Sequence, residues 1–445
     1  MKTPFYGVFL FLIVMKIEEI YKLFIECSSV CTDTRNIKKD SLFIALKGDN
    51  FDGNKFSKDA ITNGSKYALV DNIEFADNKK IFFVANTFLA LQNLAKFHRE
   101  KFNIPVVSIT GTNGKTTTKE LISFVLQEKY NVTFTKGNLN NHIGVPLTLL
   151  EINSETQIAV IEMGANHPGE IKTLCEIALP NYGIITNIGK AHLEGFGSLY
   201  GVINTKTEMY RFIKKNKGKI FINTNNEILL SHIDNNEYIS YGANEDCYLS
   251  GKNPISNPFL KLEWKMYNSN TWNTVQTNLV GNYNFENVLA AICIGNYFEV
   301  EENKITKAIH NYNPTNNRSQ IIKSENNTIL IDAYNANPTS MVAALESFFE
   351  MLGDNKVLVI GDMLELGKNT ENEHKNILQL IVQSEIKEVF LIGKTFAKTS
   401  ENTNFKSFES VSLFKDYLKN NPFLNKQILV KGSHGIHLEE LIPVL

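Results

Sequence analysis

The chain has 445 residues, of which 45 are basic and 47 acidic, so its formal net charge is -2. An apolar fraction of 43% and a charged fraction of 21% are typical of folded globular proteins and argue against disorder, collagen and coiled coil. Without a basic excess, composition gives no support to a nucleic-acid partner, and we expect none. The length suggests about three domains, and the odd number of widely spaced cysteines argues against a disulfide framework.

The N-terminal end opens on an apolar run, Phe5–Met15. This run is too short to span a bilayer, and no small-residue cleavage site follows it. We therefore interpret residues 1–14 as a start-site extension and expect no membrane insertion. Downstream, a helical pattern at 88–98 and short apolar strands predict a small α/β domain over residues 1–103, with the strands at 42–46, 67–70 and 81–85.

The middle of the chain, residues 104–313, alternates strands with helical stretches. Apolar runs at 106–109, 158–163 and 183–188 indicate buried strands, and a parallel sheet covered on both faces is the expected result. Residues 260–280 alternate instead around Asn-Ser-Asn, which predicts a hairpin appended to this core.

Residues 314–445 repeat the alternation of strands and helices. A helix is expected at 339–351, and strands at 328–332, 356–360, 388–392 and 427–430. The predicted fold class is therefore α/β with three domains. A central parallel-sheet domain is flanked by the small N-terminal α/β domain and by a C-terminal Rossmann-like α/β domain.

The strongest chemical signal is the segment Thr-Gly-Thr-Asn-Gly-Lys-Thr-Thr at residues 110–117, between a buried strand and a helix. Its glycines let backbone amides face an anion, and the helix N-terminus adds partial positive charge. We expect Lys115 to reach the β- and γ-phosphates of ATP and Thr116 to hold Mg²⁺. Ile109 stands where the usual pattern has Gly, so this is a shortened phosphate loop; an ordinary tight turn is the alternative. The predicted nucleotide-binding residues are Gly111, Thr112, Asn113, Gly114, Lys115, Thr116 and Thr117.

Two further side chains lie at predicted strand ends. Glu162 closes the strand at 158–163, where a carboxylate can hold a metal beside a nucleotide. His192 follows the strand at 183–188, on the rim where α/β sheets bind ligands. We interpret Lys115, Glu162 and His192 as catalytic; helix capping for Glu162 and a structural role for His192 are the alternatives.

Together, the phosphate loop, the Glu-Met-Gly at 162–164 and the Asn-Ile-Gly-x-x-His at 187–192 resemble the Mur ligase family. The resemblance implies an ATP-dependent ligase that converts a carboxylate to an acyl phosphate and joins it to an amine. It also implies that Asn284 and Asn287 contact adenine, that Arg318 binds phosphate, and that Asp332 contacts the ribose or nucleotide.

Within the family, the stretches at 332–341 and 361–367 resemble the member that adds D-alanyl-D-alanine to a UDP-N-acetylmuramoyl tripeptide. The Asp-Asn-Pro-Arg of the diamino-acid-adding ligase is absent. The N-terminal domain resembles the family's UDP-sugar domain and is expected to bind through Thr34 and Arg35, while Asn335 and Asn337 would contact the acceptor. His434 stands where relatives commonly carry Arg.

The resemblance also implies two Mg²⁺ ions, held by Thr116, Glu162, His192 and a carbamylated Lys206, which joins the predicted catalytic residues. Without the resemblance, Lys206 would be interpreted as a solvated surface lysine. We expect a cytoplasmic monomer. The alternatives are a ligase that adds the third residue, a polyglutamate synthase, or a phosphate-loop protein that is not a ligase.

Overall fold

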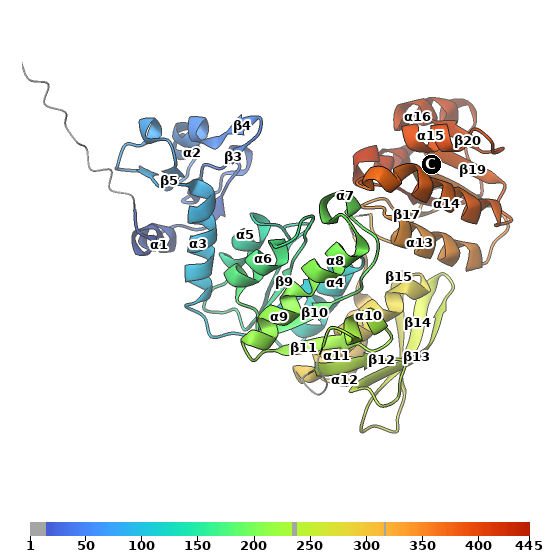
Figure 1. Cartoon of the computed structure of the whole chain (residues 1–445), viewed down its shortest axis with the longest axis horizontal. Helices are drawn as coiled ribbons and strands as arrows, with labels where there is room; N and C mark the ends of the chain where they lie inside the picture. Colours follow the sequence, from blue (N-terminus) through green and yellow to red (C-terminus); the bar gives the residue numbers. More distant parts are fainter. Residues whose placement is uncertain (1–14, 234–237, 316) are drawn as a thin grey trace, which may run out of the picture. The chain divides into compact units, whose positions relative to one another are not determined.

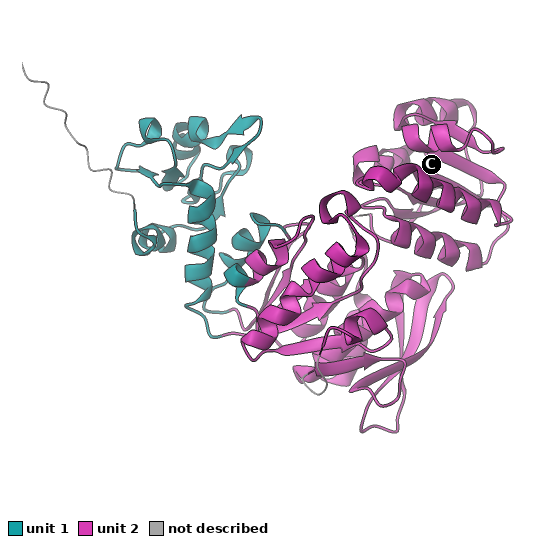
Figure 2. Ribbon diagram, viewed as in Figure 1, with its two compact units in different colours: residues 1–103, 141–155, 176–179 teal, residues 104–140, 156–175, 180–445 magenta. Residues whose placement is uncertain are grey.

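The computed structural model describes residues 15–233, 238–315 and 317–445 (Figure 1). The predicted start-site extension at residues 1–14 lies outside the described residues. The chain forms two compact units (Figure 2). Unit 1 contains residues 1–103, 141–155 and 176–179, and unit 2 contains residues 104–140, 156–175 and 180–445. No helix among the described residues is long and apolar enough to cross a membrane.

Unit 1 is built on a parallel sheet in the order β1-β2-β5-β6. The three strands predicted here are confirmed, and apolar side chains of β2 and β5, such as Phe43 and Ala68, are fully buried. A small hairpin, β3–β4, follows β2. The bounds are β1 Val30–Cys31, β2 Leu42–Ile44, β3 Lys47–Gly48, β4 Phe51–Asp52, β5 Tyr67–Val70, β6 Ile81–Phe83, α1 Ile17–Ile25, α2 Ser57–Thr62, α3 Thr87–Arg99 and α5 Gly144–Leu149.

The first sheet of unit 2 has nine strands in the order β15-β14-β13-β12-β11-β10-β7-β9-β8. Strands β7 to β13 pair in parallel, as predicted, whereas β13, β14 and β15 are antiparallel. The predicted hairpin is confirmed as β14–β15, and it continues the main sheet. The bounds are β7 Val106–Thr110, β8 Val132–Phe134, β9 Ile158–Glu162, β10 Tyr182–Ile185, β11 Lys219–Asn223, β12 Tyr238–Gly242, β13 Leu249–Ser256, β14 Phe259–Met266 and β15 Asn273–Val280.

Helices cover both faces of this sheet. On one face, Leu121 and Val125 of α4 share a buried core with Val288 and Leu289 of α11. On the other, α9 packs so closely on β10 that a Cβ at Gly183 would lie 2.2 Å from Ile213. The bounds are α4 Lys115–Gln127, α6 Glu170–Ala178, α7 Leu193–Phe196, α8 Leu199–Lys206, α9 Glu208–Lys215, α10 Glu227–Leu230, α11 Phe285–Tyr297 and α12 Glu302–Asn311.

The second sheet of unit 2 has six strands in the order β16-β17-β21-β18-β19-β20, parallel except for β16. Alternate residues of β17 enter two separate cores, Leu330 with α13 and α14, Ile331 with α16. Helices therefore cover both faces, which confirms the predicted Rossmann-like domain. The bounds are β16 Gln320–Lys323, β17 Thr328–Asp332, β18 Lys356–Gly361, β19 Glu388–Ile392, β20 Lys406–Phe408, β21 Gln427–Lys431, α13 Pro338–Glu350, α14 Thr370–Val382, α15 Lys394–Thr399 and α16 Val411–Asn420.

Candidate nucleotide and metal site

The loop from β7 to α4 has the backbone that its glycines allow. Gly114 caps α4 with φ +75°, a left-handed conformation, and a Cβ there would lie 2.5 Å from Asn287 Oδ1. A Cβ at Gly111, where φ is +146°, would lie 2.0 Å from Thr186 Oγ1. Since a side chain at either position would force its neighbours apart, glycine is required at both.

A second segment holds this loop in place. Asn187, just after β10, accepts from Asn113 N–H through its side chain at 2.9 Å and donates to the Asn113 carbonyl at 3.1 Å. The Asn187 carbonyl accepts from Thr112 N–H at 2.9 Å. We predicted no role for Asn187. The predicted strand at 183–188 includes it, whereas β10 ends two residues earlier, at Ile185.

The first turn of α4 has no capping side chain. The N–H groups of Lys115, Thr116 and Thr117 have no helical carbonyl before them to bond. The Lys115 ammonium lies over the loop, 2.9 Å from the carbonyls of Gly111 and Thr112. Desolvation, with a further contribution from the charge of Arg318, lowers the pKa of Lys115 to about 8, against an opposing effect of Glu162. An anion bound here would meet both the N–H groups and this ammonium.

Glu162, at the end of β9, fits a metal ligand. Only 1% of it is exposed, and its Oε1 accepts from Thr116 Oγ1 at 3.2 Å and from Asn140 Nδ2 at 2.7 Å. Its Oε2 is buried without a hydrogen-bond partner among the described residues. A buried carboxylate oxygen without a partner is costly unless a cation or donor joins it. Mg²⁺ prefers such oxygen ligands, so Glu162 and the Thr116 hydroxyl suit it.

Metal binding by protein side chains alone has no support. Among the described residues, no group of three or more His, Cys, Asp or Glu side chains could hold a metal ion. Because Mg²⁺ is usually bound by one or two carboxylates together with substrate phosphates, the pair formed by Thr116 and Glu162 matches a nucleotide-dependent site.

His192 faces the C-terminal domain. Its backbone is left-handed, with φ +50°, and its Nδ1 pairs with Glu365 Oε2. This hydrogen bond lowers the pKa of Glu365. If Nδ1 carries the proton, Nε2 is left as the acceptor or metal-ligating atom of the ring.

Lys206 ends α8 and is only 2% exposed. Its ammonium lies 5.7 Å from the centre of the Phe196 ring, and within the described part of the chain it makes no hydrogen bond or ion pair. Burial, and after it the charge of Lys115, lowers the pKa of Lys206 well below its usual value. The expectation of a solvated surface lysine, which spacing alone would give, therefore does not describe this side chain.

The two asparagines expected to contact adenine bond to the protein itself. Asn287 accepts from Thr118 Oγ1 at 3.0 Å and donates to Asn284 Oδ1 at 2.9 Å. Asn284 in turn donates to the Val280 carbonyl at 2.8 Å. These bonds fix the start of α11 against α4, so the structure brings both residues to the phosphate loop with their amides already engaged.

Arg318 and Asp332 lie in the C-terminal part of unit 2. The Arg318 guanidinium stacks 3.7 Å from the centre of the Tyr334 ring, and its Nε is buried without a partner among the described residues. Asp332 forms an ion pair with the buried Lys431 at 2.5 Å and accepts from Ser319 N–H at 3.3 Å. Arg318 therefore lies against an aromatic ring, and one oxygen of Asp332 already neutralises a buried cation.

The predicted acceptor contacts differ in exposure. Asn335 is exposed, whereas Asn337 is 5% exposed and caps α13. His434, also exposed, lies edge-on to Tyr334 with ring centres 5.8 Å apart. Arg318 and His434 thus both contact the Tyr334 ring.

Comparisons with known proteins match three stretches of the chain. Residues 26–109 match a model described as the Mur ligase family, catalytic domain; residues 109–295 match the Mur ligase middle domain. Residues 317–421 match the Mur ligase, glutamate ligase domain. The chain belongs to the Mur ligase family. The resemblance predicted from the motifs is thereby confirmed.

Relatives within the Mur ligase family cover almost the whole chain. The UDP-N-acetylmuramoyl-tripeptide–D-alanyl-D-alanine ligase of Bacillus subtilis is 37% identical over 94% of this chain and 92% of its own. The protein of the same name from Escherichia coli is 33% identical over 95% and 94%. A crystal structure of MurF from Acinetobacter baumannii has a TM-score of 0.84 and 27% identity, and covers 97% of this chain and 98% of that one. MurF from Thermotoga maritima in complex with ADP, 24% identical with a TM-score of 0.81 and coverage of 94% and 96%, shares the fold.

The residues predicted to bind the UDP-sugar belong to unit 1. Arg35 makes a bidentate contact with Asp33, its Nε at 2.9 Å and its Nη2 at 2.7 Å, although its side chain is 86% exposed. Hydrogen bonds from Arg35 lower the pKa of Asp33 to about 2. Thr34 is partly buried in the same short 3₁₀ turn. Thr34 and Arg35 therefore lie in one short 3₁₀ turn of this Mur ligase, directly after Asp33.

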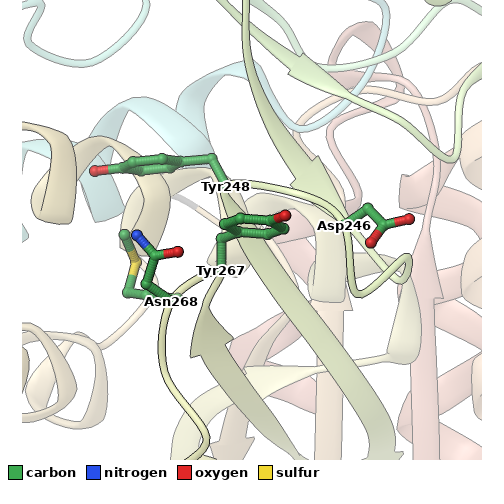
Figure 3. Close-up of a pocket in the computed structure, with 5 residues that line it drawn as sticks. Asp246, Tyr248, Tyr267 and Asn268 are labelled. Atoms are coloured by element: carbon green, nitrogen blue, oxygen red, sulfur yellow. The ribbon is translucent and has the colours of Figure 1, made fainter.

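A pocket of about 380 Å³ lies on the antiparallel part of the central sheet (Figure 3). Strands β12, β11 and β10 separate β13 from β7 in the sheet order. The pocket is thus separate from the phosphate loop, and we assign it no part in Mur ligase chemistry. It is lined by Asp246, Tyr248, Met266, Tyr267 and Asn268.

Proposed function

We propose that this Mur ligase joins D-alanyl-D-alanine to the terminal carboxylate of a UDP-N-acetylmuramoyl tripeptide, with ATP converted to ADP and phosphate. The observation that carries the proposal is the near-complete coverage by relatives of that name, at 37% and 33% identity. The product is a UDP-muramoyl pentapeptide. These relatives do not favour the alternatives of a third-residue ligase or a polyglutamate synthase.

The domains divide the substrates among them in this proposal. Residues 1–103 bind the UDP-sugar, with Thr34 and Arg35 among the contacts. Residues 104–313 bind ATP, and residues 314–445 present the amine acceptor. Because ATP and UDP-linked precursors are cytoplasmic, we propose a cytoplasmic enzyme, and we expect it to act as a monomer.

The chemistry begins with a poor acyl donor. A carboxylate oxygen of the tripeptide attacks the γ-phosphorus of ATP, the bond to the ADP oxygen breaks, and an acyl phosphate forms. The first turn of α4, Lys115 and Arg318 supply the positive charge that this anion-to-anion transfer needs. The amine of the dipeptide then attacks the acyl carbon, phosphate leaves, and the amine proton is released. The same cations stabilise the oxyanion of the tetrahedral intermediate.

Thr116, Glu162 and His192 are the proposed Mg²⁺ ligands, with Lys206 as a fourth after carbamylation. Bound Mg²⁺ neutralises charge on the phosphate oxygens during transfer. Only a neutral amine adds to CO₂, giving a carbamate and releasing a proton, and burial favours the neutral form of Lys206. The unmodified ammonium of Lys206 would be repelled by the metal, whereas the carbamate would be a metal ligand.

The carbamylation is tested on Lys206→Ala. This variant is expected to be inactive and to recover partly with small carboxylates, which can occupy the vacated space. The native wild-type protein should carry extra mass on Lys206 that disappears when CO₂ is removed. Unchanged activity without CO₂, together with no extra mass, would exclude the carbamate.

A substrate screen tests the proposed function itself. UDP-muramoyl peptides of different length and third residue are each combined with ATP and one acceptor, and phosphate release is measured. We expect fast release with D-alanyl-D-alanine and slow release with D-alanine, L-lysine, diaminopimelate or glutamate. The exposed Asn335 can bond the peptide group or carboxylate of a dipeptide. A polar group that the bound dipeptide buries would cost about 1–3 kcal/mol if a shorter acceptor left it unpaired. Faster turnover with glutamate, or with a diamino acid and a UDP-muramoyl dipeptide, would contradict the proposal.

A further inference from the structure

The phosphate loop is hydrogen-bonded to the C-terminal part of unit 2 by a pair of asparagines. Asn337 Nδ2 donates to Asn113 Oδ1 at 2.7 Å, and Asn113 Nδ2 lies 3.5 Å from Asn337 Oδ1. The two residues are 224 positions apart in the chain. Asn113 lies between the two glycines that shape the loop, and Lys115 follows two residues later.

The orientation of Asn337 is fixed by α13. Its Oδ1 accepts from Ser340 N–H at 2.9 Å, and Ser340 Oγ accepts from Asn337 N–H at 3.1 Å, which together form a capping box. With Oδ1 used by the helix, Nδ2 is left to reach the loop. The side chain is 5% exposed, so water does not replace this contact freely.

Asn113 has the complementary arrangement. Its backbone N–H and carbonyl are bound by Asn187, so the residue cannot move without the loop. Its side-chain amide bonds to Asn337 and, among the described residues, to no group of the central domain. The Asn113 side chain thus links the loop to the N-cap residue of α13.

Two further contacts at this interface come from the segment after β10. Lys190 forms an ion pair with Glu373 at 3.0 Å, and His192 pairs with Glu365. These two contacts join the domains beside the loop, whereas the contact of Asn113 acts on the loop itself.

We infer that Asn337 is a positioning residue that fixes the phosphate loop, through Asn113, when the C-terminal domain is docked. The loop then has its geometry for phosphoryl transfer only while the domain that presents the acceptor is in place. This inference rests on the proposed function, because a ligase must avoid hydrolysing ATP before the amine is present. It assigns Asn337 a role other than direct contact with the acceptor.

The capping role and the loop contact can be separated by substitution. Ser is as good an N-cap as Asn, but its side chain is too short to reach Asn113. Asn337→Ser therefore keeps the cap and loses the loop contact. Ser340→Ala is the matched control, since it removes part of the capping box and leaves Asn337 Nδ2 in place. Asn113→Ala removes the contact from the other side.

The expected result is a tenfold or greater fall in kcat for Asn337→Ser with an unchanged midpoint of thermal unfolding. Ser340→Ala should lower that midpoint by a few degrees and keep kcat. Asn113→Ala should match Asn337→Ser, and the double variant should be no worse than either, because both remove one interaction. The KM for the UDP-muramoyl peptide should not change in any of them.

A second measurement does not depend on which acceptor is used. With a non-hydrolysable ATP analogue bound, the amides of residues 110–117 should exchange hydrogen about tenfold faster in Asn337→Ser than in wild type. Normal kcat in Asn337→Ser, additive losses in the double variant, or unchanged exchange would each overturn the inference. A wild-type enzyme that turns over with another acceptor would refute the proposed function instead, and the asparagine pair would then be measured with that acceptor.

Discussion

Helices α4 and α15 of unit 2 begin in the same way, but the groups that face their N-terminal turns differ. Each follows a strand of a parallel sheet, and each is preceded by a glycine, Gly114 or Gly393, that offers no capping side chain. At α15 the carboxylate of Asp362 accepts from Thr395 N–H at 2.9 Å and from Phe396 N–H at 2.8 Å. At α4 no cap side chain bonds the helix, and Glu162 turns instead to the Thr116 hydroxyl.

The difference shows how a helix N-terminus becomes a binding site. The partial positive charge is present at both helices, and it attracts an anion in both. The C-terminal domain supplies that anion from its own β18 end, and a Cβ at Gly393 would lie only 2.3 Å from Asp362 Cγ. In the central domain no cap side chain takes this position. This contrast supports the nucleotide site proposed at α4 and argues against a second one at α15.

The largest effect that tests this contrast is expected from Lys115→Ala. Loss of the ammonium over the open helix N-terminus should reduce phosphoryl transfer by about 10²-fold or more. ADP formation and circular dichroism would be measured together. Lys394→Ala is the matched control, because Lys394 is the exposed first residue of α15, where no phosphate is expected, and its activity should equal that of wild type. Near-wild-type ADP formation by a folded Lys115→Ala would remove Lys115 from the mechanism.

A smaller effect is expected from Glu162→Gln. The amide can still bond Thr116, but it lacks the charge that the partnerless Oε2 offers to a cation. The Mg²⁺ concentration for half-maximal activity should rise roughly tenfold or more. Activity would be titrated with Mg²⁺ at saturating ATP; an unchanged Mg²⁺ requirement would show that Glu162 is a structural carboxylate like Asp362.

The smallest effect is expected from Asp362→Asn, and it concerns stability alone. The amide presents one oxygen where two N–H groups need acceptors, which costs about 1–3 kcal/mol of unfolding free energy. Although burial alone would raise the pKa of Asp362, the nearby His374 ring and hydrogen bonds from the N–H groups of Thr395 and Phe396 hold it below its usual value. Its stabilisation is therefore present above the unfolded pKa of about 3.9 and lost as the pH falls further.

Urea unfolding of wild type and Asp362→Asn at neutral and acidic pH would measure this. The two unfolding free energies should differ at pH 7 and converge below about pH 4. ADP formation at pH 7 should be unaffected. A loss of activity without a loss of stability would indicate that α15 also has a ligand.

Local patterns predicted many of the strands and the glycine positions correctly, because these depend on neighbouring residues. They did not predict several others, namely β1, β8, β11, β12, β13, β16 and β20. The run at 388–392 is β19 as predicted, and Gly111 and Gly114 have the backbone that a phosphate loop needs. Contacts between distant residues could not be predicted in this way. Nothing near Asn113 in the sequence indicates Asn337, and nothing near His192 indicates Glu365.

The burial of some side chains could not be predicted from the local sequence pattern either. Lys206 ends a helix in a polar stretch that would suit a solvated surface, yet the fold encloses it. The Asn287 amide accepts from Thr118, a residue that only the packing of α11 on α4 brings near, whereas the Asn284 amide bonds the Val280 carbonyl four residues away. Motif spacing located these residues without showing what they bond.

Unit 1 is built from three separate segments of the chain, and this affects how it can fold during synthesis. Three polar side chains of α3 donate to carbonyls far ahead in the chain: Gln92 to His142, His98 to Ile152, and Arg99 to Ala178. A ribosome that has released the first 103 residues has not yet synthesised any of these acceptors. The N-terminal unit can complete its hydrogen bonds only after the phosphate loop has emerged, and a fragment cut at residue 103 would lack the acceptors of these three bonds.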